Sequence, residues 1–193
     1  MSKPTLQIVV GSTRPGRVGL PVAQWFDGVA REQGAFSVEL LDLAEVALPL
    51  LDEPGHPVAR RYEHPHTLAW SETIDRGDAY VFVIPEYNHS FNAATKNALD
   101  FLHAEWNDKP VGFVSYGGVA AGTRAMTALK PVVTALRMTP VVEAVNIPFV
   151  AQFLDDEGRF VPNEALSLGA AGMLAELVRL DGALRPLRAG TGG

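Results

Sequence analysis

One short segment limits the fold of this chain more than any other feature of its sequence. Residues 79–84 are Ala-Tyr-Val-Phe-Val-Ile, so every position carries an apolar or aromatic side chain. A strand with one solvent-facing side alternates apolar and polar residues, whereas a strand covered on both faces is apolar throughout. The segment therefore predicts a central strand in a sheet that has helices on both sides.

Four further apolar or β-branched segments are expected to be strands, and segments with a helical pattern separate them. This alternation predicts an α/β fold of three layers around a five-stranded parallel sheet. Right-handed crossovers and a length of 193 residues favour the flavodoxin-like strand order 2-1-3-4-5. The expected strands are residues 6–10, 36–41, 79–84, 111–115 and 141–145, and the expected helices are residues 18–33, 58–76, 91–103, 123–137 and 163–180.

Length and composition limit the domain organisation and the partners. We expect a single domain over residues 1–184 and a flexible, glycine-rich tail over residues 185–193. The net charge of −6 gives no reason to expect nucleic acid or an anionic membrane as a partner. The absence of cysteine excludes disulfides, thiolate nucleophiles and iron–sulfur ligation. Without a signal peptide or an apolar stretch of membrane-spanning length, the chain is expected to be soluble and cytoplasmic.

The segment after the first expected strand is the strongest candidate for a binding site. Residues 11–17 (Gly-Ser-Thr-Arg-Pro-Gly-Arg) lie between that strand and a helix. The first turn of a helix has N–H groups without intrahelical acceptors and a partial positive charge, so it favours an anion. Ser12 and Thr13 add hydroxyl donors, and the guanidinium groups of Arg14 and Arg17 suit a phosphate. The segment indicates a site for one phosphate, although an ordinary turn would use similar residues.

Two known phosphate-binding loops do not match this segment. The P-loop ends in Lys followed by Ser or Thr, but here Arg17 and Val18 follow the second glycine. The dinucleotide motif requires a glycine where the backbone approaches a pyrophosphate, but Thr13 stands at that position. We therefore expect a terminal phosphomonoester rather than a pyrophosphate.

The loops after the third and fourth strands carry groups that suit a flat ligand with polar edges. In residues 85–90, Tyr87 offers an aromatic face, Asn88 offers an amide, and Ser90 is expected to cap the next helix. The paired glycines at residues 117–118 allow the backbone itself to approach a ligand. Because the C-terminal ends of parallel strands meet at one edge, these loops and the phosphate loop predict a site for a phosphorylated planar heterocycle.

Four segments of the chain carry a resemblance to a known family: Gly11-Ser12-Thr13-Arg14, Pro85-Glu86-Tyr87-Asn88-His89-Ser90, Lys96-Asn97-Ala98-Leu99-Asp100 and Ser115-Tyr116-Gly117-Gly118. They resemble, in order, motifs of the NAD(P)H-dependent FMN reductases, a family that includes quinone, azo-dye and chromate reductases. The resemblance covers roughly residues 5–145. Phe91-Asn92-Ala93 replaces a usual proline, and Thr95 stands where an apolar residue is common. Both departures lie on the expected helix, so they bear on its start and on oligomer contacts more than on the flavin site.

The resemblance implies a flavodoxin-like fold, tightly held FMN, NADPH or NADH as electron donor, and a homodimer or homotetramer. It places the FMN phosphate on the first loop and the isoalloxazine ring between the other two loops. It names no catalytic side chain. The expected FMN-binding residues are Ser12, Thr13, Arg14, Arg17, Pro85, Glu86, Tyr87, Asn88, Ser115, Gly117 and Gly118.

The function implied by the resemblance is that of an oxidoreductase that passes hydride from NAD(P)H through bound FMN to a small acceptor. Quinones, free flavin, azo compounds and metal oxyanions are the expected acceptors, in a ping-pong mechanism. The apolar segment at residues 48–51 is expected to wall the site. Two alternatives stay open, namely a flavodoxin-like one-electron carrier and a non-catalytic nucleotide-binding module.

Other polar residues receive a structural interpretation. His56, His64 and His66 lack further ligands at metal-site spacing, so no metal is expected. Glu86 lies at a strand–loop junction, where hydrogen bonding or oligomer contacts are expected rather than general-base chemistry. The paired arginines at residues 60–61 are expected to be solvated on a helix.

Association between copies of the chain is expected through the helix that carries residues 96–100 and through the helix beyond Gly122. The first of these regions has more apolar side chains than one face against a sheet needs. These side chains belong to Phe91, Ala94, Ala98, Phe101 and Leu102.

Overall fold

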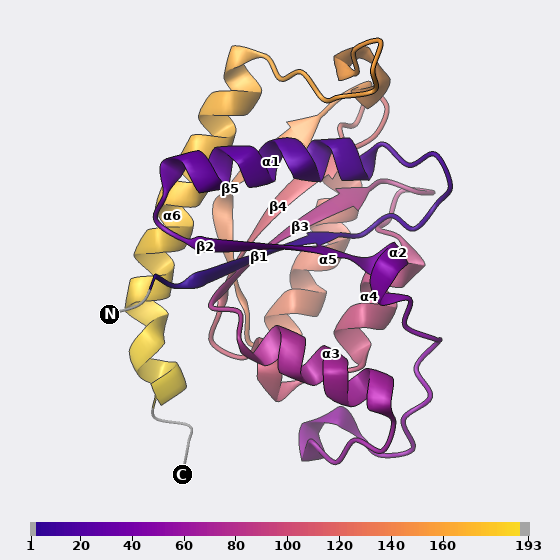
Figure 1. Cartoon of the computed structure of the whole chain (residues 1–193), viewed down its shortest axis with the longest axis vertical. Helices are drawn as coiled ribbons and strands as arrows, with labels where there is room; N and C mark the ends of the chain where they lie inside the picture. The colour runs from indigo at the N-terminus through magenta and orange to yellow at the C-terminus, as the bar shows by residue number, and fades with distance from the viewer. Residues whose placement is uncertain (1–2, 190–193) are drawn as a thin grey trace.

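A computed structural model describes residues 3–189, which form three layers around one parallel sheet (Figure 1). Within these residues the sheet has five strands in the order β2-β1-β3-β4-β5, and all neighbouring pairs are parallel. The predicted flavodoxin-like fold and strand order are therefore confirmed. The strands are β1 (Thr5–Val10), β2 (Ser37–Asp42), β3 (Ala79–Pro85), β4 (Pro110–Tyr116) and β5 (Thr139–Ile147).

The apolar residues of β3 alternate between two cores, one on each face of the sheet. The longer helices are α1 (Gly19–Gln33), α3 (Pro65–Asp75), α4 (Ala93–Asp100), α5 (Thr123–Ala135) and α6 (Glu164–Ala189), and the short ones are α2 (Leu43–Val46), η1 (Pro57–Ala59), η2 (Ala104–Trp106) and η3 (Val150–Phe153). Val81 and Val83 lie in the core under α1 and α6, whereas Phe82 and Ile84 lie in the core under α3, α4 and α5. Every residue of β3 is buried, as its sequence predicts.

Helix α3 begins later than the sequence suggests. It starts at Pro65 rather than near residue 58, because His64 is held extended before the proline and Arg60 has a left-handed backbone with φ of 48°. Arg60 therefore lies outside the helix, and it forms ion pairs with Asp75 and Glu105. The prediction that the paired arginines are merely solvated is wrong for Arg60.

The last helix is longer than predicted. Helix α6 continues to Ala189, and Arg188 in its final turn pairs with Asp181 and with Asp78. Residues 185–189 are therefore helical, which corrects the prediction of a flexible tail for that part, while residues 190–193 lie outside the described residues. None of the described helices is long and apolar enough to cross a membrane.

The apolar residues of the region expected to mediate association are mostly in the core. Ala98, Phe101 and Leu102 are at most 1% exposed, and Phe91 and Ala94 are partly buried against the same core. These side chains therefore offer no surplus apolar surface, contrary to expectation, and association through this region stays a prediction.

Candidate functional site

Three loops at the C-terminal ends of β1, β3 and β4 surround a cavity of about 170 Å³. Seven of the residues predicted from the sequence line it, whereas Thr13, Asn88, Ser115 and Gly118 do not. The structure therefore brings the three predicted loops together around one space. The lining residues are Ser12, Arg14, Arg17, Val18, Pro85, Glu86, Tyr87, Tyr116, Gly117 and Val150.

The first loop is fastened to the start of α4. Asn92 Nδ2 donates to Gly11 O at 2.6 Å, and Thr95 Oγ1 donates to Asn92 Oδ1 at 2.8 Å. A Cβ on Gly11 would lie 2.5 Å from Thr95 Oγ1, so a glycine is needed for this close approach. Asn92 and Thr95 belong to the two departures from the family pattern. Asn92 is the N-cap residue of α4, as expected for the helix start, and the structure also places both side chains against the phosphate loop, while their part in oligomer contacts stays a prediction.

Positive charge and free donors collect where the first loop enters α1. The side chain of Arg14 is exposed and has no hydrogen bond or ion pair to another described residue. Arg17 forms an ion pair with Asp42 at the end of β2, and its buried Nε has no acceptor among the described residues. Val18 precedes α1 without a side-chain cap, so N–H groups of the first helical turn remain available. Together these groups offer an anion several donors.

The second loop is a tight hairpin turn. Tyr87 and Ser90 exchange two backbone hydrogen bonds, of 2.9 and 3.0 Å. Asn88 and His89 between them have positive φ values of 49° and 66°, as a two-residue turn requires. Both are exposed, and Asn88 is not among the residues that line this cavity, so its contact with the flavin stays a prediction. The prediction that Ser90 caps α4 is also wrong, because Asn92 occupies the N-cap position.

Glu86 supports the start of α5. Its carboxylate accepts hydrogen bonds from Arg124 Nη1 at 2.8 Å and from the Arg124 backbone N at 3.1 Å. Burial raises the pKa of Glu86, but these hydrogen bonds and the charge of Arg124 outweigh it, so the pKa lies below its usual value. The carboxylate is therefore ionised and occupied, as expected for a hydrogen-bonding role.

The third loop combines a buried anchor with open glycines. Ser115 Oγ lies 2.9 Å from Ala121 O and 2.8 Å from Asn146 Oδ1, so it holds the loop rather than lining the cavity. Gly117 lines the cavity, whereas a Cβ on Gly118 would meet no atom within 4 Å. Gly118 thus lies at the open rim of the site.

Three lining residues were not predicted as site residues. Val18 and Val150 are apolar, and no signal in the sequence connects Val150, which follows β5, with the other loops. Tyr116 directly precedes the paired glycines, and this position in the sequence could have identified it as a site residue.

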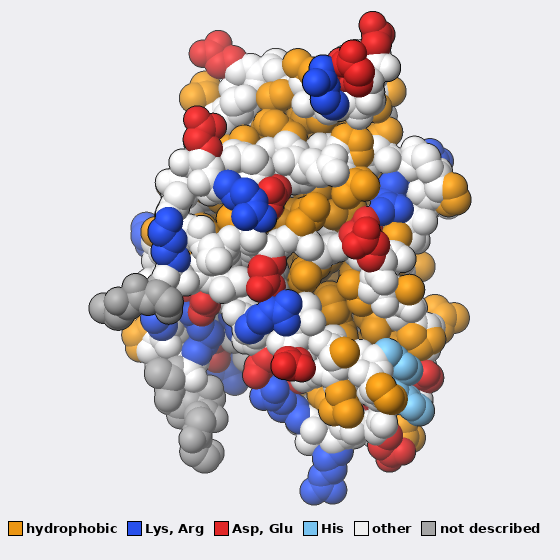
Figure 2. All heavy atoms as spheres, viewed as in Figure 1, with side chains coloured by type: hydrophobic (Ala, Val, Ile, Leu, Met, Phe, Trp, Pro, Cys, Tyr) orange, Lys and Arg blue, Asp and Glu red, His pale blue; other side chains and the backbone are white. Residues whose placement is uncertain are grey.

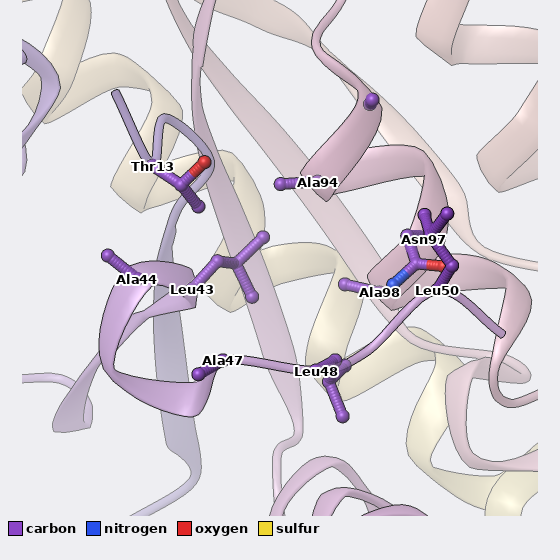
Figure 3. Close-up of a pocket in the computed structure, with 10 residues that line it drawn as sticks. Thr13, Leu43, Ala44, Ala47, Leu48, Leu50, Ala94, Asn97 and Ala98 are labelled. Carbon is purple, nitrogen blue, oxygen red and sulfur yellow. The ribbon is translucent and has the colours of Figure 1, made fainter. Parts of the chain in front are cut away.

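A second cavity, of about 460 Å³, lies beside the phosphate loop (Figure 3). Hydrophobic side chains gather on the side of the molecule where Figure 1 shows α2 and α4 (Figure 2). Asn97 Nδ2 donates to Pro49 O at 2.7 Å, and Asn97 Oδ1 accepts from Leu51 N at 2.9 Å, so α4 holds the apolar segment that closes this cavity. The lining residues are Thr13, Leu43, Ala44, Ala47, Leu48, Leu50, Ala93, Ala94, Asn97 and Ala98.

The histidines considered for a metal connect a loop to α3. His66 Nε2 lies 2.9 Å from Asp52 Oδ1, His64 Nε2 lies 3.2 Å from Asp52 O, and the two rings stack with centroids 5.2 Å apart. In the described part of the chain, no three His, Asp or Glu side chains are grouped so as to hold a metal ion.

Residues 4–152 match the profile of a family described as NADPH-dependent FMN reductase, over more than half of the chain. The chain belongs to this family. An NAD(P)H-dependent FMN reductase of Schizosaccharomyces pombe is 38% identical over 149 residues, covering 75% of this chain and 74% of that protein. Another NAD(P)H-dependent FMN reductase, of Saccharomyces cerevisiae, is 32% identical over 153 residues, covering 73% of this chain and 80% of that protein. The solved structure of FerB, a flavoenzyme NAD(P)H:acceptor oxidoreductase of Paracoccus denitrificans, has a TM-score of 0.74 at 20% identity. The alignment covers 94% of this chain and 98% of FerB, which supports the fold.

Membership of the NADPH-dependent FMN reductases confirms three predictions from the sequence. The chain is an oxidoreductase, its cofactor is FMN, and its electron donor is NAD(P)H. The first cavity fits the phosphate end of FMN, because the buried Nε of Arg17 is a donor without an acceptor in the described chain. An anion at this position would supply that acceptor.

Proposed function

We propose that the chain binds one FMN at the C-terminal end of the sheet and uses it to pass hydride from NAD(P)H to a small acceptor. The observation that carries this proposal is the set of available donors at the start of α1. These are the Arg14 guanidinium, the Nε of Arg17 and the uncapped N–H groups of the first turn. They favour a phosphomonoester, because phosphate oxygens accept several charge-assisted hydrogen bonds at once. Ser12 and Thr13 add hydroxyl groups to the same loop.

The planar ring is assigned to the space between the β3 and β4 loops. Pro85 and Tyr87 line this space from one loop, and Gly117 lines it from the other. A Cβ on Gly117 would lie 3.3 Å from Gly122 N and 3.4 Å from Glu86 Cβ, so the glycine permits the close approach of these loops. The exposed Asn88 and Gly118 lie at the rim, where they are available to the polar edge of a ring, and Ser115 holds the loop behind it.

When bound, FMN accepts hydride from the nicotinamide and passes the electrons on to the acceptor. The side chains of the protein bind and orient the reactants. The carboxylate of Glu86 is bound to Arg124, so we assign it no proton transfer. The segment held by Asn97 forms an apolar wall beside the phosphate loop. A cavity of about 460 Å³ with this lining suits a flat, mostly apolar acceptor.

Quinones and azo compounds are the acceptors we favour, with free flavin and metal oxyanions as further candidates. Relatives named as an azoreductase in Staphylococcus saprophyticus and as a probable quinone oxidoreductase in Oryza sativa support this choice. We infer a ping-pong order, in which the oxidised nicotinamide leaves before the acceptor occupies the same open face.

Anaerobic mixing tests the proposal. NADH or NADPH should bleach the absorbance of the bound flavin, and steady-state turnover with a quinone should give parallel lines in double-reciprocal plots. Intersecting lines would contradict the ping-pong order. A bound flavin that dithionite reduces but neither nicotinamide reduces would favour the one-electron carrier.

We also propose that the chain forms a homodimer or homotetramer, which its family resemblance supports. Leu50 is 82% exposed and Val119 is 78% exposed, so apolar side chains near the site are available to a second copy. Light scattering should give two or four times the chain mass of 20.7 kDa. The mass of a single chain at micromolar concentration would contradict association.

A further inference from the structure

Tyr116 is the last residue of β4, and its side chain is buried in the core under α1 and α6. It pairs in register with Pro85 on β3 and with Ile147 on β5, and only 5% of its surface is exposed. Its ring lines the cavity between the three loops. The strand thus delivers a phenol hydroxyl from the centre of the sheet to the wall of the site.

No described residue is in hydrogen-bonding geometry with the hydroxyl of Tyr116, although the Ser12 side chain is near enough to act on its pKa. Buried hydroxyl groups nearly always have one, because leaving a buried donor unpaired destabilises the folded chain. By contrast, the hydroxyl of Tyr87 in the same cavity lies 3.0 Å from Ser12 Oγ. The unpaired hydroxyl therefore points to an acceptor that is not part of the described chain.

The hydroxyl is located at the start of α1. A Cβ on Gly19, the first residue of that helix, would lie 2.5 Å from Tyr116 Oη, so the glycine makes room for the hydroxyl. The Ser12 side chain, and then the charges of Arg14 and Arg17, oppose the rise that burial causes in the pKa of Tyr116. The pKa nevertheless stays above its usual value, and the group remains a neutral donor at physiological pH.

We propose that Tyr116 Oη donates a hydrogen bond to the phosphate of FMN and is a specificity-determining residue for FMN over riboflavin. This inference rests on the proposed function, because it assumes that FMN occupies the cavity with its phosphate at the start of α1. Phosphate oxygens are the acceptors that the neighbouring guanidinium and N–H donors select. The ring of FMN is assigned to the space between the β3 and β4 loops.

The test compares Tyr116→Phe with Tyr80→Phe, a matched control at a second buried tyrosine. Tyr80 Oη donates to Ile74 O at 2.7 Å and accepts from Lys109 Nζ at 3.1 Å. Tyr116→Phe should weaken FMN binding about tenfold to hundredfold, the range for a hydrogen bond to a charged group, and leave riboflavin binding within about twofold. It should also leave the melting temperature of the apoprotein unchanged or raised, because it removes an unpaired buried group.

The control should show the opposite pattern. Tyr80→Phe should lower the melting temperature of the apoprotein, because two partners lose a hydrogen bond, and should leave FMN affinity unchanged. If Tyr116→Phe does not fold, Gly19→Ala provides a second variant, since its methyl group displaces the hydroxyl. Gly19→Ala should also weaken FMN binding more than riboflavin binding.

Two results would overturn the inference while leaving the proposed function intact. One is wild-type protein that binds FMN together with variants that bind it within about twofold of the wild type. The other is an equal loss of FMN and riboflavin affinity in the variants. Wild-type apoprotein that does not bind FMN at all would overturn the proposed function and this inference with it.

Discussion

The two ends of the sheet each bury a tyrosine hydroxyl, but only one of these hydroxyls makes a hydrogen bond of normal geometry with a described residue. At the N-terminal end of the strands, Tyr80 Oη bonds to Ile74 O and to Lys109 Nζ. At the C-terminal end, Tyr116 Oη has no partner in the described chain. Since both groups are buried to a similar degree, burial alone does not distinguish them. The comparison supports the proposal that the tyrosine hydroxyl at the second end binds a ligand, whereas the paired hydroxyl at the first end stabilises the fold.

Cavity volume alone favours the opposite end of the sheet over the space between the three loops. A polar cavity of about 500 Å³ lies near Lys109, larger than the 170 Å³ space between the three loops. The Nζ of Lys109 already donates to Ile74 O at 3.1 Å, to Asp75 O at 3.0 Å and to Tyr80 Oη. We therefore locate the proposed ligand site by its available donors rather than by cavity volume.

The largest expected difference between the two ends is in the loss of stability when a glycine is replaced by alanine. Gly122 at the site end has φ of 78°, and an added Cβ would lie 2.5 Å from Tyr116 N. Gly122→Ala should therefore destabilise by about 2–5 kcal/mol, from about 1–2 kcal/mol for the left-handed backbone and about 1–3 kcal/mol for overpacking. At the other end, the atoms closest to a Cβ on Gly77 are in the Gln7 side chain, at 2.6 and 2.8 Å. In urea unfolding, Gly77→Ala should lower the free energy of unfolding by less than Gly122→Ala does. Equal losses in the two variants would contradict a rigid backbone at the site.

Removing the exposed arginine should separate ligand binding from folding. Arg14→Ala should weaken FMN binding by about 1.5–3 kcal/mol, about tenfold to hundredfold, because a charge-assisted hydrogen bond is lost. Its effect on unfolding should be within about 0.5 kcal/mol, since its side chain pairs with no described residue. Calorimetric titration of the variant with FMN and with riboflavin measures the two affinities. Equal losses for the two ligands would show that Arg14 supports the loop instead of the phosphate.

Lys109 at the N-terminal end of the sheet should make the stability of the folded chain depend on pH. Burial lowers the pKa of Lys109 from its usual 10.5 to about 8, although Asp75 and Asp78 oppose the change. Between these values the unfolded chain binds more protons than the folded chain, so stability rises with pH. Wild-type protein should gain about 1 kcal/mol from this group between pH 7 and pH 9. In Lys109→Met the gain should disappear, and an identical gain in both proteins would remove Lys109 as its source.

Much of the fold could be predicted because it follows from local patterns. The apolar segment that became β3 fixed a sheet covered on both faces, and crossover handedness then limited the strand order. The start of α3 was missed although Pro65 marks it, because the helical pattern was extended back across the proline. The end of α6 depends on pairs such as Arg188 with Asp78, 110 residues apart, and such contacts leave no local signal.

The site was predictable to the level of its loops rather than of its side chains. Glycines, hydroxyls and arginines between a strand and a helix indicate an anion site whatever the rest of the chain does. The outward position of Asn88 follows from the left-handed turn that it shares with His89, which residue types alone do not fix. The hydrogen bond from Asn92 to Gly11 and the unpaired hydroxyl of Tyr116 arise from packing between segments distant in sequence.

The most direct test of the central claim is the amount of FMN that the purified protein holds. A visible spectrum before denaturation, followed by quantification of the released flavin, should give flavin bands and one FMN for each chain of 20.7 kDa. A colourless protein that stays colourless after incubation with FMN and desalting would contradict a flavin site at the C-terminal end of the sheet.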